Sequence, residues 1–376
     1  MRSVRIQVGA AALLALTATA CGTSAAPVAD SSTTPAAPTP TAPARRASAV
    51  TPPEDAVLAA ARTEGTVLVY GNADDQTFAP IVKAFEAKYP FLKAQTLGLD
   101  DTAVYQRYLS EKATGARTAD VLLDGEPAGF LDLVAKGEIQ PYRDPNLDNL
   151  PDYAVLAPGV SAISEDPLVA VFNRQLLPEA KQPTSLTALA EMSPSLKGKV
   201  VTGDIENLYG YGATYNYTRK GGEAAWGTLQ QLGPNTRIER KSSLAFPKIA
   251  QGEYQAGFFL SGAVRAFITG DVAKVLNYRY LTDGTVVTPR GVGLTTAAEH
   301  PNAGKVFINF LLSVEGQQAA CQGGLTPYRD GVDCALGLDS VKQAIGADNV
   351  IVGTWSQELV DQRPSVLARW KTVFTG

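Results

Sequence analysis

A strand, a turn and a helix follow one another near the C-terminal end of the chain, and this order constrains the fold more than any other feature. Residues Gly291–Thr295 form the short apolar run of a buried strand. After a turn of small residues, the apolar side chains of Val306–Leu311 fall on one helical face. Pro301 suits the first turn of that helix, because a backbone N–H would have no partner there. The pattern predicts a strand–turn–helix unit of an α/β domain.

The same alternation of strands and helices runs through the earlier part of the chain. The continuous apolar runs Thr66–Tyr70 and Ala119–Leu123 are typical of strands that are covered on both faces of a mostly parallel sheet. Ala103–Thr114 lies between them and has helical spacing. Pro167–Asn173 and Ala256–Leu260 predict two further strands. We therefore predict an α/β protein, and its 376 residues are enough for two lobes of ordinary domain size.

The start of the chain has the composition of a secretory signal. Arg2 and Arg5 precede the apolar segment Val8–Ala18, which is too short to span a bilayer. The residues that end at Cys21 resemble a lipobox, which implies cleavage before Cys21 and lipidation of its thiol. The alternative is an ordinary secreted protein that is cut at the same place, with no lipid on Cys21. Either way, we expect the folded body to lie outside the cytoplasm.

A segment of low complexity separates this signal from the rest of the chain. Thr23–Pro53 consists almost entirely of alanine, proline, threonine and serine, so it cannot form a hydrophobic core. Its prolines favour extended, solvated chain. We expect a disordered tether that carries the body at the outer surface of the cell membrane.

Composition excludes several functional classes. The chain has 33 Lys and Arg against 37 Asp and Glu, whereas a nucleic-acid-binding protein would carry a basic face. His300 is the single histidine, so a multi-histidine metal site cannot form within one chain. The motifs of serine hydrolases, zinc proteases and EF-hands are missing from the sequence. We therefore expect a binding protein without a cofactor. The enzymatic alternative would use paired carboxylates such as Asp124 and Glu126.

The cysteines suggest one disulfide. Secretion would place them in oxidising surroundings. With Cys21 assigned to the lipid, Cys321 and Cys334 remain, on either side of a glycine-containing loop. We predict that they pair and stabilise the fold by roughly 3 kcal/mol on the chain-entropy account. The alternative is two free, buried thiols.

Several segments resemble one protein family. His300–Gln317 resembles a segment of the solute-binding proteins of ABC importers, in their two-lobed type II class. Gly137–Tyr142, Leu196–Val201 and Tyr280–Thr285 resemble other segments of the same family, and the likeness covers most of Glu54–Tyr328. The resemblance implies a type II periplasmic-binding-protein fold, in which each lobe is a mostly parallel sheet flanked by helices. The two lobes would close about a hinge around a ligand in the cleft between them.

The resemblance also implies an order of domains and a set of partners. Residues 1–20 would be the signal peptide, 21–53 the lipid-anchored linker, and 54–167 the first part of lobe one. Residues 168–276 would form lobe two, and 277–376 would return to lobe one and end in helices. The partners would be a permease and its ATPase. We expect a monomer that binds no nucleotide and no nucleic acid.

Candidate ligand-binding residues follow from strand ends and helix starts. In open α/β sheets, ligands lie beyond the carboxyl ends of strands, at helix N-termini. Gly203–Gly212 is predicted to be a loop of lobe two in which glycines let the backbone approach a ligand. The alternative is that the polar residues cap helices and the tyrosines pack the loop. The candidates are Asn72, Asp74, Asp75, Asp124, Gly125, Glu126, Asn207, Tyr209, Tyr211, Ser242, Ser243 and Ser261.

The charge of these loops favours a cationic ligand. They hold several carboxylates and two tyrosines but no lysine or arginine, which suits an amine or a metal ion. The ferric-ion binders of the family use two adjacent tyrosines where this chain has Gly262 and Ala263. Tyr209 and Tyr211 are the candidates to replace them.

An anionic ligand is the alternative. Any of three arginines could reach the cleft and bind a phosphonate or a sugar phosphate. These arginines are Arg265, Arg279 and Arg290. A further alternative is an envelope lipoprotein that keeps the fold without transport.

Overall fold

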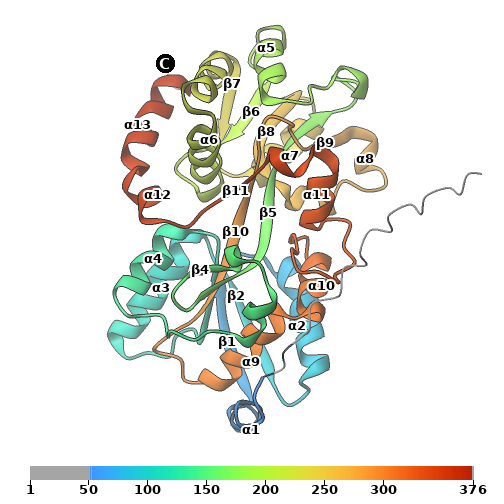
Figure 1. The fold of residues 1–376 in the computed structure, drawn as a ribbon. Coiled ribbons are helices and arrows are strands. Elements are labelled where there is room, and N and C mark those ends of the chain that lie inside the picture. The colour runs from blue at the N-terminus through green and yellow to red at the C-terminus, as the bar shows by residue number, and fades with distance from the viewer. Residues whose placement is uncertain (1–50, 52, 375–376) are drawn as a thin grey trace, which may run out of the picture. The chain divides into compact units, whose positions relative to one another are not determined.

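A computed structural model of the chain describes residue 51 and residues 53–374 (Figure 1). The predicted signal, the lipidation site Cys21 and the linker up to residue 50 lie outside the described residues. Within the described part, no helix combines the length and the apolar character that a membrane crossing requires.

The first half of the body is built on a parallel sheet. Strand β1 pairs in parallel with β2 on one side and with β3 on the other, as their apolar sequences predict. The strands are β1 (Thr66–Gly71), β2 (Lys93–Gly98) and β3 (Val121–Asp124). The accompanying helices are α1 (Asp55–Glu64), α2 (Asp75–Lys88), α3 (Asp101–Thr114) and α4 (Pro127–Ala135).

Two long strands link the first half to the second. They are β5 (Val160–Asn173) and β10 (Thr285–Leu294), which pair antiparallel over Val160–Pro167 of β5. Beyond Pro167, the rest of β5 pairs instead with two strands of the second half. The pairing of β5 with β10 shifts register at Arg290 and Gly291. Figure 1 shows both strands running between the two groups of elements.

The second half repeats the arrangement around its own strands. Strand β6 pairs in parallel with β7 and β8, and β8 pairs antiparallel with β5. The strands are β6 (Val200–Gly203), β7 (Thr236–Glu239), β8 (Ala256–Ser261) and β9 (Leu276–Arg279). The helices are α5 (Leu186–Leu196), α6 (Leu208–Leu232), α7 (Ser242–Ala250) and the single turn α8 (Val272–Val275).

The remaining elements follow β10 or are short. After β10 come α9 (Pro301–Leu312), α10 (Val314–Gln322), α11 (Leu338–Ile345), β11 (Val350–Val352), α12 (Gln357–Asp361) and α13 (Arg363–Phe374). Strand β4 (Val155–Ala157) pairs with β5. The short 3-10 helices are Pro145–Asn149, Asp152–Ala154, Glu179–Lys181, Gly233–Asn235, Gly262–Ala266 and Ala347–Asn349.

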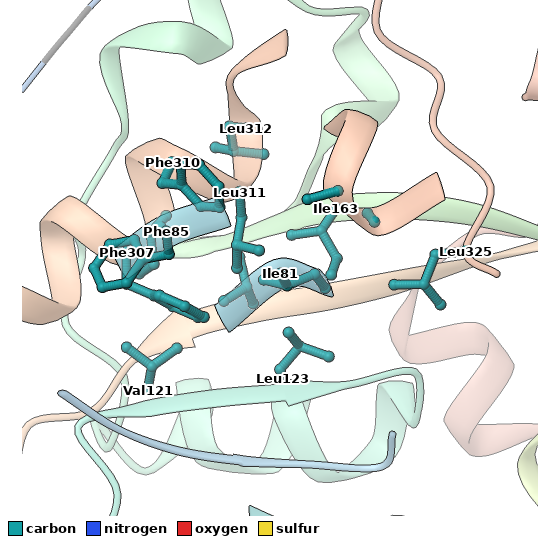
Figure 2. Close-up of a cluster of buried hydrophobic side chains, with 14 of the residues drawn as sticks. Ile81, Phe85, Val121, Leu123, Ile163, Phe307, Phe310, Leu311, Leu312 and Leu325 are labelled. Carbon is teal, nitrogen blue, oxygen red and sulfur yellow. The ribbon is translucent and has the colours of Figure 1, made fainter. Parts of the chain in front are cut away.

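Each half, called a lobe from here on, has its own hydrophobic core. In lobe one, Phe307 and Phe310 of the predicted apolar stripe on α9 lie against Phe85 of α2 (Figure 2). Their ring centroids are 5.0 and 5.5 Å, respectively, from the ring centroid of Phe85. All three side chains are fully buried. Each contributes roughly 1.5–3 kcal/mol by leaving water. The predicted strand–turn–helix unit is therefore confirmed and supplies a large part of this core.

The C-terminal helix adds to the other core. Trp370 and Phe374 of α13 stack at 4.5 Å and join the buried cluster of lobe two, which includes Phe258 of β8. Figure 1 shows α13 (red) beside α6. The helices α9 to α11, in contrast, add to the core of lobe one. The part of the chain after residue 276 thus contributes to both lobes.

Helix α6 begins inside a segment that the sequence predicted to be a loop. The predicted loop Gly203–Gly212 becomes helical at Leu208, because the Asn207 side chain accepts a hydrogen bond of 2.9 Å from the backbone N–H of Gly210. Helix α6 then runs on to Leu232, with a break at Gly222, whose φ is 56°. Ser313 caps a new helix, α10, by accepting from the N–H of Gly316.

Cys321 of α10 and Cys334 are joined by a disulfide, with their Cα atoms 6.1 Å apart. The bond closes the loop between α10 and α11. This is the pairing that the cysteine count predicted.

Candidate functional site

The central residue of the candidate site is Arg290, on the linking strand β10. Its side chain is buried, with a 5% exposed fraction. Its Nε donates to Asp166 Oδ2 at 3.2 Å, its Nη1 donates to the side-chain oxygen of Asn72, and its Nη2 donates to the hydroxyl of Tyr209 at 2.7 Å. Asn72 follows the end of β1 in lobe one, and Tyr209 lies in the first turn of α6 in lobe two. One guanidinium group therefore joins a strand end of one lobe to a helix start of the other.

Asp166 on β5 provides the counter-charge of Arg290. Its side chain is also buried, and its second oxygen accepts from the backbone N–H of Thr326 at 3.1 Å. Taking two charges out of water is unfavourable unless both are paired and hydrogen-bonded. The pair satisfies that condition and joins the two strands that link the lobes.

The end of β3 contributes a second group of predicted residues. Asp124 is fully buried and accepts from the N–H of Glu126 at 3.0 Å across the buried Gly125. Glu126 caps α4 by accepting from the N–H of Ala128 at 3.1 Å. These carboxylates therefore fix the loop and the helix start in lobe one.

A second arginine lies at the lobe boundary. Arg363, the first residue of α13, forms a 3.5 Å ion pair with Glu126 of lobe one. It also donates to the backbone carbonyl of Glu206 in lobe two at 2.9 Å, and its guanidinium lies 5.2 Å from the ring centroid of Tyr211. Arg363 was not among the predicted residues, because no local pattern around it marks a site.

Tyr211 does not reach the lobe boundary with its hydroxyl. The side chain is 2% exposed, and the hydroxyl donates to the backbone carbonyl of Leu359 inside lobe two. Burial raises the pKa of this phenol above its ordinary value of 10, so the phenolate is disfavoured. Tyr211 and Tyr209 therefore differ: the hydroxyl of Tyr209 is turned towards Arg290 of the linking strand, and that of Tyr211 into the core.

The other predicted residues cap helices or lie at the surface. Asp74 caps α2 by accepting from the N–H of Thr77 at 2.9 Å, and Asp75 is exposed in the first turn of that helix. In lobe two, the hydroxyl of Ser242 accepts from the N–H of Ser261 at 3.0 Å, which joins the start of α7 to the end of β8. Ser243 is exposed beside it.

One exposed ion pair also crosses the boundary. Lys241, which precedes α7 in lobe two, lies 2.5 Å from Asp100, which precedes α3 in lobe one. The hydrogen bond from Lys241 lowers the pKa of the Asp100 carboxyl. An exposed pair of this kind contributes about 0–1 kcal/mol, so it marks proximity more than stability.

The described residues contain no group of three histidine, cysteine or acidic side chains that could hold a metal ion. Cavities are found beside the disulfide and in lobe one. One of about 40 Å³ is next to Cys334, and one of about 210 Å³ is lined by Tyr142, Leu147 and Val155.

Solved structures share this arrangement. The substrate-binding protein of an ABC transporter from Agrobacterium tumefaciens superposes with a TM-score of 0.72 at 20% identity, over 82% of this chain and 94% of that one. AfuA from Actinobacillus pleuropneumoniae, with fructose-6-phosphate bound, gives 0.68 at 21% identity, over 83% and 99%. Iron-bound HitA from Pseudomonas aeruginosa gives 0.64 at 21% identity, over 80% and 99%. The predicted two-lobed type II periplasmic-binding-protein fold is thereby confirmed.

The sequence itself matches a family. The pattern of the family described as bacterial extracellular solute-binding protein fits residues 80–344, which is more than half of the chain. This match spans both lobes and the two strands that link them. The chain belongs to the family of bacterial extracellular solute-binding proteins.

Proposed function

We propose that the protein is the substrate-binding component of an ABC importer. It captures a small polar solute between its lobes and delivers it to a membrane permease that is driven by an ATPase. The observation that carries the proposal is the hydrogen-bonding of Arg290 to both lobes, because a ligand that contacts this group meets strand ends and helix starts from both sides. Family membership and the fold of the compared structures support the same role.

The ligand that the geometry supports best is a small organic anion, such as a phosphorylated sugar or a phosphonate. Arg290 and Arg363 both lie at the lobe boundary, and a guanidinium group binds phosphate or carboxylate with paired hydrogen bonds. The helices α2, α4 and α6 begin beside these residues, and helix N-termini favour anions. AfuA, one of the compared proteins, holds fructose-6-phosphate.

The carboxylates that favoured a cation in the sequence have other partners in the structure. Asp74 and Glu126 cap helices, and Asp124 accepts from a backbone N–H.

Iron or an organic cation is the second candidate, favoured by the acidic loops and by the iron bound to HitA. Ferric ion would need phenolate ligands that converge on one point. The hydroxyl of Tyr209 accepts from Arg290, whereas that of Tyr211 donates to Leu359, so this pair does not converge.

Location and attachment complete the proposal. We expect an extracytoplasmic monomer that is anchored to the cell membrane by a lipid on Cys21, with lobe boundaries near residues 167 and 276. Replacing Cys21 with serine should move the protein from the membrane fraction to the medium. A Cys21→Ser protein that stays in the membrane fraction would contradict the lipid anchor.

Thermal-shift screening tests the ligand. The panel contains fructose-6-phosphate, a phosphonate, inorganic phosphate, ferric citrate and spermidine. A bound compound at a hundredfold excess over its Kd stabilises the fold by roughly 2.7 kcal/mol. We expect stabilisation by an organic anion, whereas stabilisation by spermidine or iron alone would favour the second candidate.

Calorimetry on a matched pair of variants then locates the site. Arg290→Gln should weaken anion binding about tenfold or more, which corresponds to ~1.4 kcal/mol. Arg279→Gln is the control, because Arg279 contacts Gln182 and the carbonyl of Glu179 within lobe two. Equal affinities of the two variants would argue against a ligand at Arg290.

A further inference from the structure

The segment between β11 and α13, Gly353–Arg363, passes from lobe two to lobe one and back. Just before the segment, the side chain of Ile351 of β11 is buried in the core of lobe two. Strand β11 pairs with Thr285–Val287 of the linking strand β10, and the N–H of Gly353 donates to the carbonyl of Val287 at 2.8 Å. The chain therefore joins the lobes here as well as through β5 and β10.

In the middle of the segment, Trp355 packs on lobe one. Its ring centroid lies 5.5 Å from that of Phe130, the central aromatic residue of α4. The indole also lies directly on the backbone of Gly291, where a Cβ atom would come within 2.6 Å of it. The side chain is thus held between a helix of lobe one and the linking strand β10.

After Trp355 the chain returns to lobe two. Ser356 caps α12 by accepting from the N–H of Leu359 at 3.2 Å. The side chain of Leu359 is buried in the core of lobe two, and its carbonyl accepts from Tyr211. The segment is therefore fixed to lobe two on both sides of its contact with lobe one.

Arg363 forms the second contact with lobe one. Its ion pair with Glu126 reaches the start of α4, while its bond to the carbonyl of Glu206 and its position over Tyr211 hold it on lobe two. Trp355 and Arg363 thus contact α4 at two places, Phe130 within the helix and Glu126 at its N-terminus.

We propose that Gly353–Arg363 is a strap that holds the two lobes together, with Trp355 and Arg363 as its two points of attachment to lobe one. The inference rests on the proposed function to the extent that the lobes open and close around a solute. For the lobes to separate fully, Trp355 must leave Phe130 and Arg363 must leave Glu126, because the chain is fixed to lobe two at Ile351, just before the strap, and at Leu359 within it. The strap therefore sets the ratio of closed to open protein, and through it the affinity for the solute.

Pulsed electron paramagnetic resonance on the full chain measures this ratio. Spin labels are placed by Ala113→Cys on α3 of lobe one and Gln230→Cys on α6 of lobe two, in a Cys21→Ser background. Both labelled residues are exposed. The distances are recorded first without any ligand, so that the result does not depend on which solute the protein binds.

The expected result is a longer distance in Trp355→Ala and in Arg363→Gln, with the ratio of closed to open protein reduced about tenfold. Arg369→Gln is the matched control, since Arg369 lies on the same helix α13 but pairs with the exposed Glu223 of lobe two. Trp355→Phe should keep most of the contact with Phe130. Arg363→Gln alters a side chain outside both cores, so it keeps the test valid if Trp355→Ala fails to fold.

Two results would overturn the strap. One is that Arg363→Gln and Trp355→Ala both give the same distribution of distances between the two spin labels as the protein with an unaltered strap. The other is that the spin-labelled protein with an unaltered strap is already open in the absence of ligand. Failure of the proposed function is a separate result: no compound of the screening panel binds, while the distances still report on the strap.

Discussion

The side chain of Arg290 donates a hydrogen bond of 2.7 Å to the hydroxyl of Tyr209, although the two residues lie 81 positions apart in the chain. Arg290 belongs to a strand that links the lobes, and Tyr209 to the first turn of a helix in lobe two. The contact therefore couples the geometry of the linking strands to that of the second lobe.

Tyr209→Phe removes the hydroxyl from this contact. We expect the solute affinity to fall about tenfold, or ~1.4 kcal/mol, because the guanidinium loses the group that orients it. Calorimetric titration measures the change. Tyr254→Phe is the control, since Tyr254 donates to Glu239 at 2.7 Å within lobe two and should leave affinity unchanged. Wild-type affinity in Tyr209→Phe would separate this tyrosine from ligand binding.

Asp166→Asn removes the counter-charge of buried Arg290. Breaking a buried ion pair by removing one partner typically destabilises a fold by about 3–5 kcal/mol, because the remaining charge is uncompensated. Urea denaturation measures the loss. Asp271→Asn is the comparison, since Asp271 pairs with Lys274 at an exposed position and should change stability by less than about 1 kcal/mol. A loss of similar size in both variants would contradict the importance of the buried pair.

Glu165→Gln should make the protein more stable at neutral and alkaline pH. Glu165 on β5 is completely buried, and neither carboxylate oxygen has a hydrogen-bond partner among the described residues. Burial, and then the neighbouring Asp166, raise the pKa of its carboxyl well above 4.5. The contribution of this carboxyl to stability is therefore fully present below the pKa that Glu165 has in the unfolded chain. It is lost as the pH rises through the higher pKa that Glu165 has in the folded protein.

Denaturation at pH 5 and pH 8 tests this change in Glu165. The wild-type chain should lose more stability between the two pH values than Glu165→Gln does, since glutamine does not titrate. Parallel pH dependences in the two proteins would show that the carboxyl of Glu165 is not the titrating group.

Cys334→Ser opens the loop that the disulfide closes. The two cysteines are 13 positions apart, and closing a loop of this length stabilises by roughly 3 kcal/mol on the chain-entropy account. Denaturation of the wild-type chain with and without a reductant gives the same comparison without a substitution. No difference between the oxidised and reduced protein would mean that the loop is held by its packing alone.

Local patterns predicted the elements of the fold well. The stripe on α9, the apolar strands and the helix starts depend on residues a few positions apart, so periodicity and capping reveal them. The start of α6 was missed although Asn207 is a suitable cap, because the glycines that follow it favoured a loop.

The candidate site was predicted only in part, because its contacts are distant in sequence. Asn72 was named from its position after a strand, but its partner Arg290 lies 218 positions away. The hydroxyl of Tyr211 meets a carbonyl 148 positions away, so its burial depends on how the C-terminal segment packs. Counting charges in the predicted loops favoured a cation, and the sequence did not show which of those carboxylates cap helices.

The position of β10 has a consequence for the order of folding. In the sheet of lobe one, β10 lies between β3 and β5, and it pairs with both. Lobe one therefore lacks an inner strand until residues 285–294 have been synthesised, after the strands β6 to β9 of lobe two. Until then β3 has a partner on one side only, so the sheet of lobe one cannot be completed before most of the chain is available.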